Sequence, residues 1–171
     1  MGKLTEIANK HNCDKGTQAY EQHGYTEVYD KYIPSQGEFV LLEIGVWKGD
    51  SLKMWKEYNP QLIVHGIDIS PLCTDCENVH IGSQSDVKFL THVCDEIGPI
   101  DFIIDDGSHK YSDIITSFFY LYPRLKSGGW YFIEDLHASY ADRKRVIEEI
   151  EDNGFEMILE CNDKLLIIRK K

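Results

Sequence analysis

Four carboxylates and one histidine stand at the ends of two apolar runs of this sequence. Asp105 and Asp106 end the first run, in the stretch IIDDGSH whose last residue is His109, and Glu134 and Asp135 end the second run, WYFI. Neighbouring strands of a sheet lie about 4.8 Å apart, so side chains at two strand ends can converge. Carboxylates that converge repel one another unless a cation neutralises them.

The chemistry of this cluster favours a divalent cation. Oxygen ligands select hard ions, with Mg²⁺ first and Mn²⁺ or Ca²⁺ next. A purely structural cluster would need several lysine or arginine partners, and the segments that flank the acids contain few. His109 is the candidate general base, because a side chain with a usual pKa of about 6.5 suits proton transfer at neutral pH. His137, three residues after Glu134, is the second candidate.

A glycine-containing loop follows an earlier apolar run, in LEIGVWKGDS. Glu43, Gly45 and Gly49 form an E-x-G-x-x-x-G pattern that lets a ligand approach the backbone. The pattern is neither G-x-G-x-x-G nor a P-loop, which disfavours nicotinamide and nucleoside triphosphate ligands. An ordinary strand-to-helix turn remains the alternative. Asp68, at the end of LIVHGIDI, is placed to bind ribose hydroxyls, and the alternative is that it caps the Ser-Pro turn after it.

A third polar segment, GSQSD, follows a short apolar run. Gln84, Ser85 and Asp86 are placed either to contact an adenine edge or to cap a helix that begins near residue 86. The residues themselves leave both roles open.

The elements that must position these side chains alternate along the chain. Strands are predicted at 39–46, 62–69, 79–84, 100–106, 129–136, 155–161 and 164–170, and helices at 51–59, 86–97, 111–128 and 141–154. Pro123 predicts a kink or a break in its helix. The pattern is typical of an α/β, Rossmann-like doubly wound fold: a seven-stranded, mostly parallel sheet with an antiparallel edge hairpin and helices on both faces. Such sheets bind ligands beyond the carboxyl ends of their strands.

The bulk properties limit the class of protein. The 171 residues predict one domain over 1–171, with a helical or loop segment at 1–37 that packs near the active site and the sheet core at 38–171. The net charge of −11 disfavours nucleic acid as a partner. No apolar run is long enough for a membrane span and no signal segment is evident, so a cytoplasmic location is expected. Cys73 and Cys76 form a lone CTDC, which we interpret as two incidental loop thiols.

The motifs together resemble a known family. The segments LEIGVWKGDSLKMWKEY, GIDIS, QSD, IDDGSH and LKSGGWYFIEDLHASY, with DKGT and YTEVYDKY nearer the N-terminus, are similar to class I S-adenosylmethionine-dependent O-methyltransferases. The resemblance is to the metal-dependent macrocin and mycinamicin type, which methylates sugar hydroxyls. It covers roughly residues 12–140, and the pairing of IDDGSH with IEDL is its specific part. This chain has GSQSD where the family commonly has GDQSD.

The resemblance implies roles for individual residues. Asp106, Glu134 and Asp135 would hold Mg²⁺ or another hard divalent cation, and His109 would be the catalytic base. The residues implied in S-adenosylmethionine binding are Glu43, Gly45, Gly49, Ser51, Asp68, Gln84, Ser85 and Asp86. Asp105 would either touch this cofactor or brace its loop.

The expected reaction is methyl transfer to a hydroxyl of a small molecule, a sugar or a glycosylated natural product. The alternatives are a catechol or phenol O-methyltransferase and a non-catalytic S-adenosylmethionine-binding module. The identity of the acceptor and the oligomeric state stay open, and a homo-oligomer whose second subunit helps to hold the acceptor is one option. Four tyrosines could line the acceptor pocket or pack in the core: Tyr25, Tyr29, Tyr32 and Tyr140.

Overall fold

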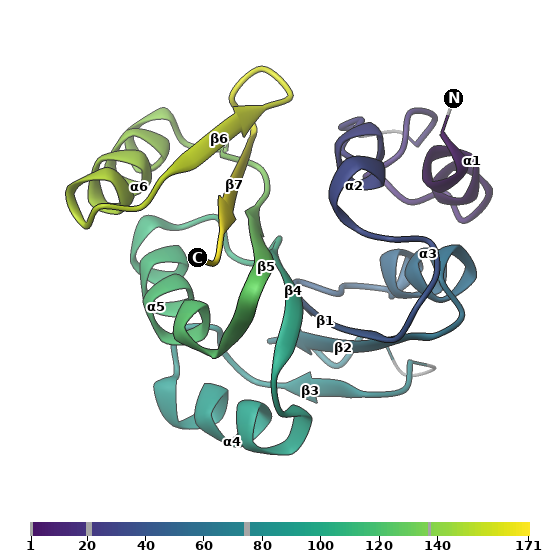
Figure 1. Ribbon diagram of the computed structural model, residues 1–171, viewed down its shortest axis with the longest axis horizontal. Helices are drawn as coiled ribbons and strands as arrows, with labels where there is room; N and C mark the ends of the chain where they lie inside the picture. Colours follow the sequence, from purple (N-terminus) through teal and green to yellow (C-terminus); the bar gives the residue numbers. More distant parts are fainter. Residues whose placement is uncertain (1, 20–21, 74–75, 137) are drawn as a thin grey trace.

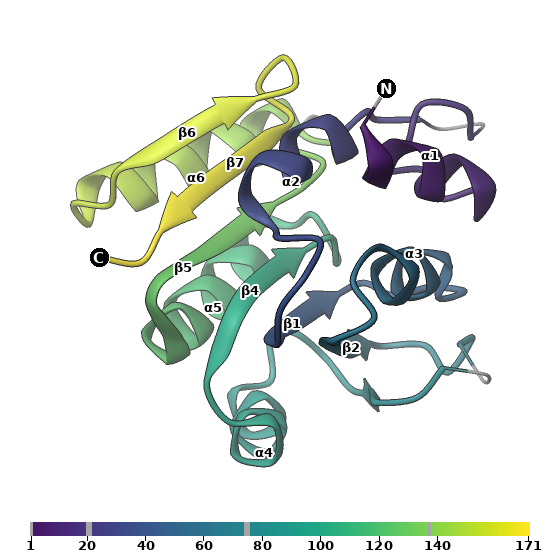
Figure 2. The same ribbon diagram turned by 45° about the vertical axis from the view of Figure 1, so that its right-hand side comes forward.

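The chain folds around one seven-stranded sheet with helices on both faces (Figures 1 and 2). The computed structural model describes residues 2–19, 22–73, 76–136 and 138–171. The strands are β1 (Phe39–Ile44), β2 (Leu62–Asp68), β3 (Val79–Ile81), β4 (Ile100–Asp105), β5 (Leu125–Ile133), β6 (Met157–Glu160) and β7 (Leu165–Arg169). The helices are α1 (Lys3–Lys10), α2 (Thr26–Tyr32), α3 (Asp50–Tyr58), α4 (Val87–Ile97), α5 (Tyr111–Leu121) and α6 (Tyr140–Asp152), with a 3₁₀ turn, η1 (Tyr122–Arg124).

The strand order creates a crevice between β1 and β4. The order across the sheet is β3-β2-β1-β4-β5-β7-β6. The first five of these strands are parallel, and β7 runs antiparallel to both of its neighbours. The Rossmann-like prediction with an antiparallel edge hairpin is therefore confirmed. Because the chain leaves β1 towards β2 but returns as β4 on the other side, the loops after β1 and β4 diverge, and ligands bind at such a point.

Alternation along the strands divides the core into two layers. Leu41, Phe102 and Ile104 contribute to the layer beneath α1, α2 and α3, whereas Leu42 and Ile103 contribute to the layer beneath α4, α5 and α6. Successive side chains of a strand point to opposite faces, so strands that are buried on both sides read as continuous apolar runs. This explains why FVLLEI and IDFIID carry so few polar residues.

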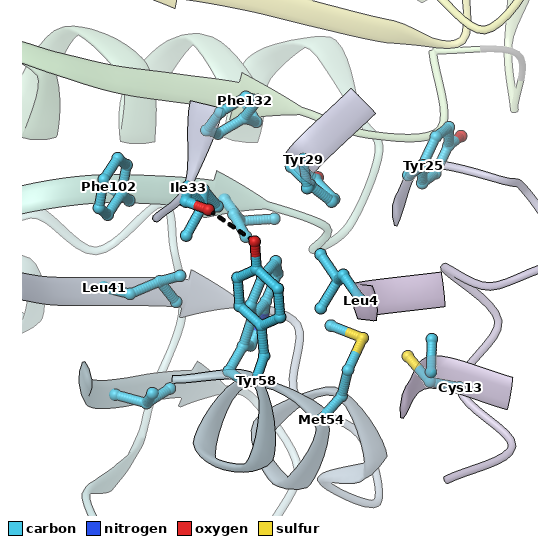
Figure 3. Packing of buried hydrophobic residues seen from close by; sticks show 14 of the residues in the cluster. Leu4, Cys13, Tyr25, Tyr29, Ile33, Leu41, Met54, Tyr58, Phe102 and Phe132 are labelled. Atoms are coloured by element: carbon cyan, nitrogen blue, oxygen red, sulfur yellow. Dashed lines mark hydrogen bonds between the residues drawn. The ribbon is translucent and has the colours of Figure 1, made fainter. Parts of the chain in front are cut away.

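The N-terminal segment is anchored in the first of these layers (Figure 3). Leu4 of α1 is fully buried, and the ring of Tyr29 from α2 packs edge-on against Phe132 of β5 at 4.9 Å. The hydroxyl of Tyr58 in α3 donates a hydrogen bond to the carbonyl of Ile33 at 3.0 Å. These contacts fix the segment against the sheet, so its polar side chains have defined positions near the carboxyl ends of β4 and β5.

The predicted helix over 111–128 was too long. The helix α5 ends at Leu121, η1 follows, and β5 begins at Leu125 rather than at residue 129. Pro123 lies in η1. Proline lacks a backbone N–H and its ring collides with the preceding helical turn, so it breaks the helix here instead of kinking it.

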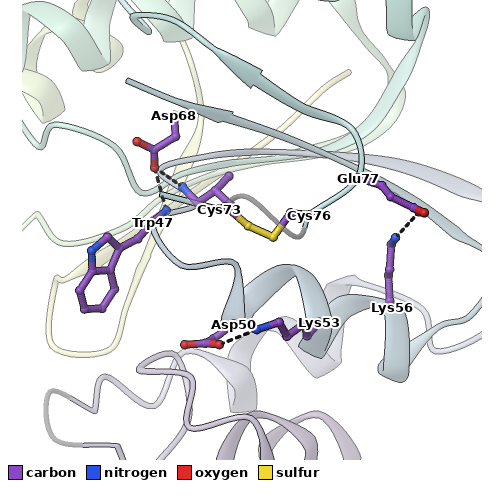
Figure 4. The surroundings of a disulfide bond; sticks show 9 residues. Trp47, Asp50, Lys53, Lys56, Asp68, Cys73, Cys76 and Glu77 are labelled. Atoms are coloured by element: carbon purple, nitrogen blue, oxygen red, sulfur yellow. Dashed lines mark hydrogen bonds and ion pairs between the residues drawn. A yellow bond between two sulfur atoms is a disulfide. The ribbon is translucent and has the colours of Figure 1, made fainter. Parts of the chain in front are cut away.

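The interpretation of Cys73 and Cys76 as two incidental loop thiols was wrong. The turn after β2 brings their Cα atoms within 5.5 Å, and the two residues form a disulfide (Figure 4). A Cβ at Gly49 would collide with both sulfur atoms, so this position has room only for glycine. Among the described residues, no helix is both long and apolar enough to cross a membrane.

Candidate active site at the carboxyl ends of the parallel strands

Two adjacent cavities open where the loops after β1 and β4 diverge. One, of about 160 Å³, is lined by residues that include Asp68 and Gln84. The other, of about 220 Å³, is lined by residues that include Ser51 and Asp106. Each is smaller than the roughly 300–1,000 Å³ of a typical small-molecule pocket. Gly45 lines both, so the two cavities together suit one elongated ligand that passes this glycine.

Gly45 permits the close approach of the two loops. Its φ is +86°, and a Cβ built there would collide with the carbonyl oxygen of Asp106. Only glycine adopts this backbone conformation readily and also leaves that space. The structure therefore explains this glycine by the approach of the loop that carries Asp106, and the approach of a ligand to its backbone stays a prediction.

We expect Gly45→Ala to lower the melting temperature by roughly 8 °C, since strain and collision together cost about 3 kcal/mol. Gly154→Ala is the matched control, because Gly154 also has a positive φ, +81°, but nothing lies within 4 Å of its added Cβ. Thermal melts followed by circular dichroism would measure both variants. Equal losses would mean that the collision with Asp106 contributes nothing.

Asp68 ties the glycine loop to the end of β2. Its carboxylate accepts a hydrogen bond from the backbone N–H of Trp47 at 2.7 Å (Figure 4). It also accepts from the backbone N–H groups of Val46 (2.9 Å) and Ser70 (2.8 Å). Trp47 has a φ of +46°, a conformation that a bulky residue adopts only when its surroundings impose it. Asp68 thus caps the following turn and also lines a cavity, so the two readings of this residue are compatible.

The GSQSD segment separates into three roles. Gln84 lines the smaller cavity beside Asp68, and its Oε1 accepts a hydrogen bond from the N–H of Ser108 at 2.7 Å. Asp86 caps α4 by accepting from the first backbone N–H groups of that helix. The hydroxyl of Ser85 bonds that of Ser83. Neither Ser85 nor Asp86 lines either of these two cavities, so their contacts with a cofactor stay predictions that the cavity linings do not support.

Asp105 braces the loop and faces away from Asp106. Its carboxylate accepts from Gln84 Nε2 (3.0 Å), Ser117 Oγ (2.6 Å) and the N–H of Gly107 (3.3 Å). Burial raises the pKa of the Asp105 carboxyl to about 6. Adjacent residues at a strand end point in opposite directions, which explains why two neighbouring aspartates have different partners.

Glu43 lies under the glycine loop rather than in either cavity. The residue is fully buried, and its Oε2 accepts from Trp55 Nε1 at 3.2 Å. A cofactor contact through Glu43 therefore stays a prediction that the cavity lining does not support.

Asp106, His109 and Asp135 come together at the outer side of the acid cluster. One ligand atom from each lies within 4.8 Å of the others, a spacing that could hold a metal ion. His109 and Asp135 both have a positive φ, +57° and +55°. Strained backbone of this kind concentrates at functional sites. Two oxygen donors and an imidazole fit a divalent cation.

Glu134, the third predicted metal ligand, has other partners. Its Oε1 accepts from the hydroxyl of Tyr29 at 2.5 Å and its Oε2 from the ammonium of Lys15 at 3.0 Å. Each carboxylate oxygen has two lone pairs, so Glu134 stays a predicted ligand. His137, the second candidate for the base, lies outside the described residues.

Lys15 is the residue of the candidate site that reasoning from the sequence missed. Its Nζ lies 2.5 Å from Asp106, 3.0 Å from Glu134 and 3.3 Å from Glu43. Burial alone would lower the pKa of Lys15, but the three carboxylates together raise it well above its usual value. The expectation drawn from the few lysines and arginines of the flanking segments was therefore incomplete, because the cationic partner of these acids comes from a segment that is distant in sequence. DKGT, one of the motifs of the resemblance, was the available signal.

The four tyrosines divide into site, core and surface residues. The hydroxyl of Tyr25 donates to Asp135 at 2.6 Å, as that of Tyr29 does to Glu134. Tyr32 packs against Trp130 at 4.6 Å. Tyr140 is 73% exposed. The first two tyrosines orient the acids from the N-terminal segment.

The sequence and the structure match known methyltransferases. The chain is 40% identical over 149 residues to 8-demethyl-8-alpha-L-rhamnosyl tetracenomycin-C 2'-O-methyltransferase of Streptomyces olivaceus, covering 80% of this chain and 38% of the relative. It is 36% identical over 131 residues to mycinamicin VI 2''-O-methyltransferase of Micromonospora griseorubida, covering 69% of this chain and 33% of the relative. A structure of the MycE methyltransferase in complex with Mg, SAH and mycinamycin VI superposes with a TM-score of 0.82 at 26% identity, over 99% of this chain and 53% of that one.

The chain is thus similar in sequence and in fold to O-methyltransferases of the macrocin and mycinamicin family. It has the class I methyltransferase fold of that family, as the resemblance implied. No family model matches the sequence. The chain spans only about 38% of the length of the curated relatives that it matches first.

Proposed function

We propose that the chain catalyses methyl transfer from S-adenosylmethionine to a hydroxyl of a sugar in a glycosylated natural product, with a divalent cation. The observation that carries this proposal is the meeting of Asp106, His109 and Asp135 beside a two-part cavity. The relatives are named as O-methyltransferases that act on sugar-bearing compounds.

The cavity lining supports a division of the cofactor between the two chambers. The chamber lined by Asp68 and Gln84 offers a carboxylate and an amide, which suit a ribose diol and a purine edge. The chamber lined by Ser51 and Asp106 would then take the methionine end. Such a placement brings the methyl-bearing end next to the acids and His109, where methyl transfer must occur.

The residues of the cluster suit the deprotonation of an alcohol. A bound divalent cation supplies positive charge where the acceptor oxygen becomes anionic. Asp106 and Asp135 would hold it, with Glu134 as the further predicted ligand. His109 would accept the hydroxyl proton, since a ring nitrogen of it lies within 4.8 Å of a carboxylate oxygen of Asp106 and of Asp135. Tyr25, which donates to Asp135, would keep that carboxylate in place.

Asp68→Ala is expected to weaken S-adenosylhomocysteine binding at least about tenfold, because hydrogen bonds to a charged group contribute roughly 1.5–3 kcal/mol. Isothermal titration calorimetry would measure the affinity. Asp86→Ala is the matched control: it removes a helix cap, at a cost of about 1 kcal/mol of stability, without changing the cavity. If Asp86→Ala weakened binding as much as Asp68→Ala, the proposed ribose site would be wrong.

The decisive test of the function is an activity assay on the whole chain. The purified protein would be incubated with methyl-labelled S-adenosylmethionine and glycosylated or free-sugar acceptors, with Mg²⁺ or with EDTA. Label in a sugar methyl ether that depends on the cation supports the proposal. Transfer to catechols alone would favour the catechol-type alternative, and S-adenosylhomocysteine binding without turnover on any acceptor would favour the non-catalytic module.

A further inference from the structure

Lys15 lies at the inner side of the acid cluster. Its ammonium, 1% exposed, ion-pairs with carboxylates from three separate strand ends: Glu43 in β1, Asp106 after β4 and Glu134 after β5. Within the described ranges, no other lysine or arginine forms an ion pair with these three acids. One fixed cation therefore neutralises the inner side of the cluster.

The remaining contacts show that this inner side is a built site. Trp55 Nε1 donates to Glu43, and the Tyr29 hydroxyl donates to Glu134. Glu43 and Glu134 are 0% and 1% exposed, so water cannot screen their charges. Buried carboxylates without a counter-charge would destabilise the fold strongly.

The outer side of the cluster is accessible. Asp106 and Asp135 are 17% and 19% exposed in their side chains, and together with His109 they offer the candidate cation site. Asp106 takes part in both sides, since its Oδ2 contacts Lys15. The inner side of the cluster therefore holds a cation that is part of the chain, and the outer side offers a candidate site for a cation that can exchange with solvent.

We infer that Lys15 is a tethered counter-cation that keeps the acid cluster folded without a divalent ion and that limits how tightly such an ion binds. The ammonium neutralises Glu43 and Glu134 in advance and repels a second cation at Asp106, because like charges a few ångströms apart interact strongly in a partly buried site. Lys15 is a positioning residue in this role, since it acts through the carboxylates. Only the part of the inference that concerns the outer, exchangeable cation rests on the proposed function.

Two variants of Lys15 separate its charge from its bulk. Lys15→Met removes the charge and keeps a similar length, and Lys15→Arg keeps the charge. In EDTA we expect Lys15→Met to melt about 10 °C below the wild type, because a broken buried ion pair is strongly destabilising, and Lys15→Arg to lose less than half of that. Lys10→Met is the matched control, because Lys10 pairs with Glu57 at the surface with 65% of its side chain exposed. It should melt within about 2 °C of the wild type.

The readout that a merely structural lysine would not change is the response to Mn²⁺. Mn²⁺ should raise the melting temperature of Lys15→Met more than that of the wild type, and calorimetry should show Mn²⁺ affinity at least about tenfold tighter in the variant, because the repelling charge is gone. A Mn²⁺ response no larger than that of the wild type would overturn the inference. So would a melting temperature in EDTA equal to that of the wild type.

A double variant keeps the test valid if Lys15→Met does not fold. Lys15→Met/Glu43→Gln removes one charge of each sign, so it leaves fewer unbalanced acids. It should still show a larger Mn²⁺ stabilisation than the wild type, and a smaller one would overturn the inference. Absence of Mn²⁺ binding by the wild type would instead contradict the proposed function, while the comparison of Lys15→Met with Lys15→Arg in EDTA would still stand.

Discussion

Asp106→Asn is expected to abolish methyl transfer and to leave S-adenosylhomocysteine affinity within about threefold of the wild type. The amide keeps the shape of the side chain but removes its negative charge. In the wild type this charge pairs with Lys15 and lies beside His109 and Asp135 in the candidate metal site. Loss of a group that only orients a metal ligand weakens metal affinity by roughly 10–100-fold. Loss of the charge of a ligand itself should therefore weaken Mn²⁺ affinity by more than about 100-fold. Calorimetry with Mn²⁺ and with S-adenosylhomocysteine would measure the two affinities separately.

Asp101→Asn is the control for this variant, because Asp101 lies at the opposite end of β4 and pairs with Lys126 at 2.8 Å. It should keep full activity and Mn²⁺ affinity. EDTA should reproduce the effect of Asp106→Asn in the wild type, and excess Mg²⁺ should reverse it. Full activity of the wild type in EDTA would remove the cation from the mechanism.

His109→Asn should slow the chemical step by about 100–10,000-fold, the usual contribution of a general base. Asparagine tolerates the φ of +57° at this position better than alanine does, so the variant removes the imidazole with little added strain. Single-turnover kinetics would measure the step directly, and the affinity for S-adenosylhomocysteine should stay within about threefold of the wild type.

His92→Asn is the control for His109→Asn, because His92 is an exposed histidine on α4, which packs on the opposite face of the sheet from the N-terminal segment. Its rate should equal that of the wild type. An unaltered rate in His109→Asn would assign the base to another group, with His137 as the next residue to test.

Local patterns in the sequence were sufficient to predict the fold and to bring the residues of the candidate site to one edge of the sheet. Side chains project from strands and helices with fixed periods, so the sequence pattern reveals these elements. The pattern includes the apolar runs in β1 and β4, the helical periodicity between them and the polar residues after each strand. The parallel order then requires those polar residues to meet at one edge. Asp106, His109 and Asp135 meet there as expected, and the main error in the elements, at Pro123, concerned a boundary rather than an element.

The tertiary structure decided which way each polar side chain points and what neutralises it. Asp105 and Asp106 are adjacent in sequence, yet one braces a loop through Ser117 and the other faces the cleft. Lys15 reaches Asp106 across 91 residues of chain. Pairing over such a distance depends on how the N-terminal segment packs on the sheet, and no local periodicity encodes it. The sequence by itself therefore determined where the charges gather, whereas only the packed fold determined that a lysine already balances part of them.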